Sequence, residues 1–189
     1  MTTPEQDHEL LILLRDPAQR ERGFMELMKI YKRPLYAMVR RIVVGHEDTY
    51  DVVQTTFVKV YRKLDSFQGN SKLSTWMYSI ARNAALDHLR KESRMRKVAL
   101  EDVTATRMEG LVAHSAGYSG DEIQLRLQQA VSRLPQKQQE VFNFRYFDEM
   151  PYAQIAEVTG TSVGGLKANY HLAVKKLKVY VLETPTNHE

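Results

Sequence analysis

The chain has 189 residues, of which 43% are hydrophobic, so it is long enough for one full-sized domain or two small ones with cores of their own. It contains no cysteine, which excludes disulfides, thiolate zinc sites and a cysteine nucleophile. The apolar run near the N-terminus is too short for a signal peptide or a membrane span, so we expect a cytoplasmic protein. The net charge of +4 favours a polyanionic partner.

The charges fall into blocks along the chain. Residues 71–97 are basic, with only Asp87 and Glu92 as acids. Residues 98–122 are acidic apart from Arg107, and lysines dominate again after residue 163. Two basic segments are therefore separated by an acidic one.

Apolar residues recur at helical spacing, and no run alternates as a strand would, so the sequence predicts an all-α fold. The first helix is expected near residues 7–15. The second spans about 22–44, with a kink or break at Pro34. Its predicted buried stripe consists of Phe24, Leu27, Met28, Tyr31, Leu35, Met38 and Ile42.

Gly45 is expected to end this second helix in the left-handed conformation, and Asp48 to cap the next one, which runs over residues 49–64. The core stripe of that third helix is Val53, Phe57, Val60 and Leu64. The opposite face carries polar side chains, and such a face is usually only solvated: Asp48, Asp51, Gln54 and Thr55.

The segment 73–97, LSTWMYSIARNAALDHLRKESRMRK, is expected to be a helix with an apolar first half and a cationic end. Phe67, Trp76 and Tyr78 gather around the polar loop 65–72 that precedes it. Because bases stack on aromatic rings while Lys and Arg follow the phosphates, this arrangement favours binding of single-stranded nucleic acid. The alternative is that Trp76 and its apolar neighbours are simply core residues.

Residues 98–121 have weak periodicity and three glycines, and we predict a flexible linker there. The fold is therefore expected to be two small helical domains, 1–97 and 122–189, joined by that linker. Helices of the second domain are expected near 122–133, 136–147, 151–159 and 163–181, with Pro135 and Pro151 in first-turn positions.

The last two of these helices form a helix-turn-helix pattern. Gly160 permits the turn, Ser162 caps the second helix, and Ile155 and Leu166 can pack between the two. The alternative is an αα-hairpin with a solvated lysine face. In a helix-turn-helix, the groups able to reach DNA are Ser162, Lys167, Asn169, Tyr170, His171 and Lys175.

Enzyme signatures are missing from the sequence. It has no phosphate-binding glycine motif, no G-x-S-x-G and no H-E-x-x-H, and its histidines never pair at the spacing of metal ligands. We therefore expect no catalysis, metal, cofactor or small-molecule substrate.

Two blocks of the sequence, EDTYDVVQTTFVKVYRKLDSFQGNSKLSTWMYSIARNAALDHLRK and AVSRLPQKQQEVFNFRYFDEMPYAQIAEVTGTSVGGLKANYHLAVKKLK, resemble the conserved blocks of bacterial extracytoplasmic function (ECF) sigma factors of the sigma-70 family. The resemblance covers roughly residues 8–95 and 122–181. It implies a sigma-2 domain followed by a sigma-4 domain, without a sigma-3 domain, and a connector that threads through RNA polymerase.

The resemblance also implies roles for individual residues. Asp51 and Gln54, with Asp48 nearby, would bind the coiled coil of the polymerase beta-prime subunit. The helix-turn-helix would bind minus-35 duplex DNA through the six residues named above. Melted minus-10 DNA, including a flipped base, would be held by Phe67, Gln68, Gly69, Asn70, Ser71, Lys72, Trp76, Arg82, Asn83, Asp87, His88, Arg90 and Lys91.

The implied partners are core RNA polymerase, through its beta-prime and beta subunits, promoter DNA, and an anti-sigma factor that can hold the protein at the membrane. The recognition helix departs from the family, because Asn169, Leu172 and Val174 stand where many members have arginine, which predicts fewer phosphate contacts. Two other interpretations of the residues are a stand-alone helix-turn-helix regulator and a helical protein-interaction adaptor.

Overall fold

The computed structural model describes residues 4–43, 45–101 and 122–182, and these contain helices and turns but no strand, in agreement with the all-α prediction. The chain divides into two compact units, Met1–Thr106 and Arg107–Glu189. Of the predicted linker, residues 98–101 continue a helix, and 102–121 lie outside the described residues.

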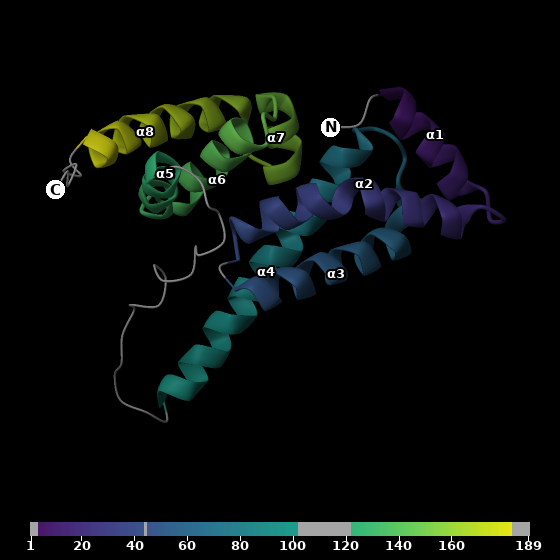
Figure 1. The fold of residues 1–189 in the computed structure, drawn as a ribbon, viewed down its shortest axis with the longest axis horizontal. Coiled ribbons are helices and arrows are strands. Elements are labelled where there is room, and N and C mark those ends of the chain that lie inside the picture. The colour runs from purple at the N-terminus through teal and green to yellow at the C-terminus, as the bar shows by residue number, and fades with distance from the viewer. Residues whose placement is uncertain (1–3, 44, 102–121, 183–189) are drawn as a thin grey trace. The chain divides into compact units, whose positions relative to one another are not determined.

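Unit 1 is a bundle in which α2 packs against α1, α3 and α4, and α3 also packs against α4. The end of α4 runs beyond α2 and α3 (Figure 1). The elements are α1 (Pro4–Arg15), α2 (Arg20–Arg40), α3 (His46–Lys63), the 3-10 turn η1 (Leu64–Ser66) and α4 (Leu73–Glu101). All four residues of the core stripe predicted for the third helix are buried: Val53, Phe57, Val60 and Leu64.

The buried face of α2 differs from the predicted stripe. Of the seven residues predicted, four are buried, Phe24 and Ile42 are half-buried, and Met28 is exposed, so the prediction for Met28 was wrong. Met28 is one residue, and hence about 100° around the helix, from buried Leu27. The helix also continues through Pro34 without ending there, because buried side chains hold it on both sides of the proline: Leu27, Tyr31, Leu35 and Met38.

The junction between α2 and α3 also differs from the prediction. Gly45 has φ −71° and ψ 135°, which is extended and not left-handed, and it is the N-cap of α3, so Asp48 lies in the first turn instead. A Cβ at Gly45 would clash with Asp48 Oδ2, so a larger residue there would require the Asp48 carboxylate to move. The Asp48 carboxylate thus folds back over the helix N-terminus, where negative charge is favourable.

Unit 2 contains the helices predicted for the second domain, with boundaries that agree to within a few residues. A π-helical turn, η2, continues α6, and Pro135 and Pro151 are N-caps just before their helices. The elements are α5 (Glu122–Ser132), α6 (Gln136–Phe142), η2 (Asn143–Phe147), α7 (Tyr152–Thr159) and α8 (Val163–Leu182). Its core cluster is formed by Ala130, Val131, Leu134, Phe142, Ala173 and Leu177.

Candidate protein and nucleic-acid interfaces

The face of α3 opposite its core stripe is solvent-accessible. Asp51 and Gln54 are exposed there, as the sequence predicted. Asp48 is half-buried instead, and its Oδ1 lies 3.4 Å from Nε2 of His88 on α4. The structure therefore separates Asp48, which contacts α4, from the two side chains that project freely from α3.

Three large apolar side chains share this exposed face, and the sequence analysis missed them. Tyr50, Val58 and Tyr61 are 45%, 49% and 45% exposed. With Gln54 they recur every three or four residues, which places them in one stripe along the helix. The sequence does indicate their exposure, because their positions along the helix fall out of phase with the buried stripe. An exposed apolar stripe with polar neighbours is typical of a protein-binding surface.

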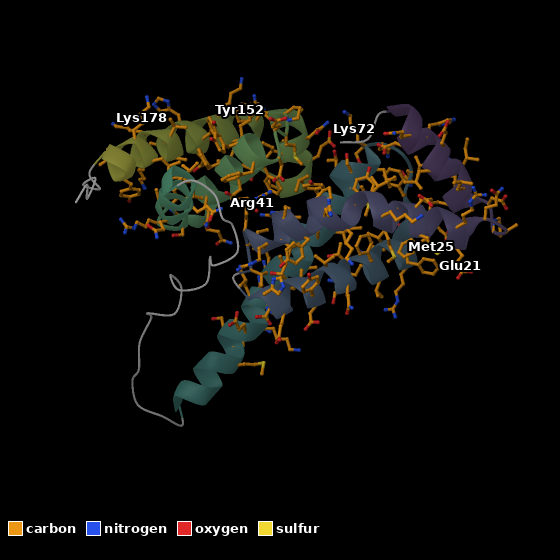
Figure 2. The ribbon with its side chains drawn as sticks, viewed as in Figure 1. Glu21, Met25, Arg41, Lys72, Tyr152 and Lys178 are labelled. Carbon is orange, nitrogen blue, oxygen red and sulfur yellow. The ribbon has the colours of Figure 1, made fainter. Side chains whose placement is uncertain are left out.

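The loop between η1 and α4 combines a fixed base with an exposed tip. Gly69 has φ +76°, which favours glycine, and the Asn70 Nδ2 donates a hydrogen bond to Gln68 Oε1 at 3.1 Å. These three residues are exposed, Ser71 is half-buried, and exposed Lys72 lies just before α4 (Figure 2). The loop thus presents amide, hydroxyl and ammonium groups to solvent, as predicted.

Phe67 and Trp76 have different environments. Phe67 is only 8% exposed, and its ring centroid lies 4.9 Å from that of Trp76, which is half-buried. The ring of Phe67 is therefore covered in this structure, whereas Trp76 retains some accessible surface, and the DNA contacts of both stay predictions. Met77 and Tyr78 are buried, so the core interpretation holds for the neighbours of Trp76.

The second half of α4 carries the predicted DNA-binding polar side chains. Asn83, Asp87, Arg90 and Lys91 are exposed, while Arg82 and His88 are half-buried. Asp87 already has two cationic partners, Arg90 Nη1 at 2.9 Å and Lys59 Nζ at 3.8 Å. Asp87 thus lies between two cationic side chains on the exposed side of α4, and its predicted DNA contact stays a prediction.

In unit 2 the helix-turn-helix has the local structure that the sequence predicted. Gly160 ends α7 with φ +68°, and the backbone N–H of Gly165 donates to Ser162 Oγ at 3.2 Å, so Ser162 caps α8. Ile155 and Leu166 are both buried. The solvent-accessible α8 is thereby held against α7 in the arrangement of a DNA-reading helix.

The six predicted minus-35 residues do not form one surface. Ser162, Lys167, His171 and Lys175 are exposed, and the last three recur every four residues along one side of α8. Lys167 Nζ also lies 6.0 Å from the ring centroid of Tyr152 on α7, which Figure 2 labels together with Lys178 further along α8.

The other two predicted minus-35 residues turn toward the protein. The Asn169 side chain donates to Gly165 O at 2.8 Å, and the Tyr170 ring stacks on buried Phe142 at 5.9 Å. Both side chains are half-buried and keep some accessible surface, so their DNA contacts stay predictions. Val163 and Leu172, which the sequence analysis did not consider as contacts, are exposed on α8 and offer apolar groups of the kind that meet thymine methyls.

The described part of the chain shows neither a membrane span nor a cluster of metal ligands. None of the helices there is both long and apolar enough to cross a membrane. Nor do three or more His, Asp or Glu side chains in the same ranges come together as a potential metal site.

Comparisons with known proteins match both units. The model of sigma-70 region 2 matches residues 27–95, and that of sigma-70 region 4 matches residues 124–177. The RNA polymerase sigma-H factor of Pseudomonas aeruginosa is 31% identical, over 89% of this chain and 90% of that protein. The ECF RNA polymerase sigma factor SigW of Bacillus subtilis is 28% identical, over 82% of this chain and 87% of that protein.

The fold matches as well. The sigma factor RpoE of Bartonella quintana, solved in complex with the anti-sigma factor NepR, has a TM-score of 0.70 at 24% identity, covering 86% of this chain and 98% of that one. On these matches, the chain belongs to the extracytoplasmic function sigma factors of the sigma-70 family and is an RNA polymerase sigma factor.

Proposed function

We propose that this sigma factor binds core RNA polymerase and melted minus-10 DNA through unit 1 and minus-35 duplex through unit 2. The observation that carries the proposal is the pairing, in one chain, of an exposed mixed polar and apolar stripe on α3 with a capped helix-turn-helix whose second helix bears a basic edge. It acts as an initiation factor that positions polymerase and DNA, without cofactor or catalytic chemistry of its own. Its place of action is the cytoplasm.

The stripe on α3 is the proposed polymerase-docking surface, and we define it as Tyr50, Asp51, Gln54, Val58 and Tyr61. The carboxylate and amide supply directional contacts to a basic coiled coil of the beta-prime subunit. The apolar side chains supply surface that becomes buried on binding, and such burial carries most of the binding energy at protein interfaces. Asp48 contributes indirectly, through its contact with α4.

Minus-10 DNA is proposed to follow the loop and the exposed side of α4. The loop tip offers hydrogen-bonding groups to an unstacked base, and the accessible surface of Trp76 offers a ring for stacking. Arg90 and Lys91 are exposed further along α4 and are suited to phosphates.

Minus-35 duplex is proposed to meet the exposed side of α8. Lys167, His171 and Lys175 provide three exposed polar groups along one side, two of them lysines. With no arginine on this helix, fewer bidentate contacts to guanine or phosphate are available, so apolar contacts from Val163 and Leu172 take a larger share of base recognition.

An anti-sigma factor is proposed as the negative regulator. The structurally similar Bartonella quintana sigma factor was solved with such a partner. The polymerase-docking surface of this chain exposes large apolar side chains, and a competing protein could bind them when polymerase is absent. An anti-sigma factor anchored in the membrane would then keep the protein at the membrane.

The test is equilibrium binding of the purified chain to core polymerase that lacks any sigma factor. Asp51→Arg should weaken binding by at least tenfold, because it reverses charge against a basic surface. The matched control is Glu9→Arg, the same kind of reversal at an exposed acid of α1, which should bind like the wild type.

Each alternative function gives a different result in this experiment. Retained duplex DNA binding without affinity for core polymerase would favour a stand-alone regulator. If the chain has no affinity for core polymerase and neither unit shows salt-dependent DNA binding, an interaction adaptor would be favoured. Equal losses from Asp51→Arg and Glu9→Arg would contradict docking through α3.

A further inference from the structure

Arg20 and Asp65 join two parts of unit 1 that are 45 residues apart in the chain. Arg20 is the first residue of α2, and Asp65 lies in η1, directly before the loop that leads to α4. The two guanidinium nitrogens Nη1 and Nη2 donate to Asp65 Oδ1 and Oδ2 at 2.9 and 3.0 Å. This bidentate geometry fixes direction as well as distance, which a single lysine contact would not.

The same guanidinium also contacts the proposed polymerase-docking surface. Its central carbon lies 5.3 Å from the ring centroid of Tyr61, and that ring packs edge-to-face on Phe24 of α2 at 5.0 Å. Tyr61 lies in the last turn of α3 and Asp65 lies four residues later in η1, so one arginine from α2 contacts both elements. Arg20 is thus shared between the docking surface and the base of the loop.

The base of the loop is fixed by two further contacts. The Ser66 hydroxyl donates to Lys63 O at 2.6 Å, and the Phe67 ring lies against Trp76 of α4. Beyond Phe67, residues 68–70 are exposed. The direction in which this tip leaves the domain therefore depends on how η1 is held, and the Arg20–Asp65 pair is one contact that ties η1 to α2.

We propose that Arg20 is a positioning residue for single-stranded DNA capture: through Asp65 it holds the loop in its DNA-binding orientation, beside the surface that docks on polymerase. This inference rests on the proposed function and assigns it a residue that meets the docking surface only at the ring of Tyr61. The hydrogen bond with Asp65 raises the pKa of Arg20. An arginine side chain is charged at physiological pH in any case, so the contact does not switch with pH on the arginine side.

The experiment uses the full chain reconstituted with core polymerase, and a library of single-stranded DNA oligonucleotides with random bases as the probe. The sequence that wild-type holoenzyme enriches is then synthesised, and its affinity is measured for each variant alongside affinity for core polymerase. Arg20→Ala should bind this oligonucleotide about two- to fivefold more weakly, the range for a single exposed ion pair. Affinity for core polymerase should stay within about twofold.

Two further variants separate positioning from a general loss of structure. Arg20→Lys keeps the charge but loses the bidentate hydrogen bonding of the guanidinium group, so its affinity for the oligonucleotide should resemble that of Arg20→Ala. The double variant Arg20→Asp with Asp65→Arg should recover at least half of the lost affinity. Arg22→Ala, at an exposed arginine of the same helix turn, is the matched control and should behave like wild type.

Several results would overturn the inference. These are wild-type oligonucleotide affinity in Arg20→Ala, an equal loss in Arg22→Ala, or a parallel loss of polymerase binding, which would make Arg20 part of the docking surface. If wild-type holoenzyme itself enriches no single-stranded sequence, the proposed function fails and the inference falls with it. That outcome is distinct, because it is seen before any variant is compared.

Discussion

The turn of the helix-turn-helix depends on a glycine in the left-handed conformation, and this gives a prediction with a definite sign. Gly160 has φ +68°, and a Cβ at that position would meet nothing within 4 Å. The effect of Gly160→Ala is therefore a matter of backbone conformation alone. Left-handed geometry costs an L-residue about 1–2 kcal/mol. The smaller entropy of the unfolded alanine chain offsets about 0.4–1 kcal/mol of this, so we expect unit 2 to lose about 1 kcal/mol.

Gly164 provides the matched control. It lies in the first turn of α8, has no positive φ, and also has open space where a Cβ would be. The same chemical change should therefore stabilise the helix, by up to about 1 kcal/mol. Opposite shifts from two identical substitutions four residues apart are the expected result.

The assay is native-state hydrogen exchange of the full chain, read out in the peptides that cover residues 122–182. It reports on unit 2 separately from unit 1. In a domain of this size 1 kcal/mol corresponds to about 4–8 °C in Tm, so thermal unfolding provides a second measure. Shifts in the same direction for both variants, or no destabilisation by Gly160→Ala, would refute the argument from backbone conformation.

Three further predictions concern packing and DNA binding. Met77→Ala should destabilise unit 1 by about 2–5 kcal/mol because the side chain is 0% exposed. Met95, on the same helix, is 63% exposed, so Met95→Ala should change stability by under about 0.5 kcal/mol. Urea unfolding followed by tryptophan fluorescence measures the stability of both variants. Gly23→Ala should loosen α1, by about 1–3 kcal/mol, since its Cβ would lie 2.9 Å from Leu13 Cβ, and limited proteolysis within α1 should then accelerate. Lys167→Ala should weaken duplex DNA binding and reduce the salt slope by about 1; an unchanged slope would exclude a phosphate contact there.

The helices and the buried stripe of α3 could be predicted from the sequence because periodicity and side-chain chemistry act locally. Gly160 and Ser162 could be assigned to the turn and the cap for the same reason. Local rules failed where a neighbouring side chain changed the role of a residue. Gly45 is extended and lies close to the Asp48 carboxylate instead of making a left-handed turn, and that approach is visible only in three dimensions.

The candidate interfaces could be predicted only in part. The helical phase correctly identified Asp51 and Gln54 as exposed, but the exposed apolar side chains beside them, such as Tyr61, were not considered, although the same phase places them outside the buried stripe. Tyr170 is a chemically reasonable DNA contact, and its ring also stacks on Phe142. The Arg20–Asp65 pair could not be foreseen, because nothing in the sequence connects two charges separated by 45 residues.

Run-off transcription tests the central claim most directly. Core polymerase lacking sigma is mixed with the purified chain and a genomic pool of promoter fragments, and the 5′ ends of the transcripts are mapped. If the chain directs promoter-specific initiation, discrete start sites that share upstream minus-35 and minus-10 sequences will appear and will be lost with Asp51→Arg. Start sites identical to those of core polymerase alone, despite a correctly folded chain, would contradict it.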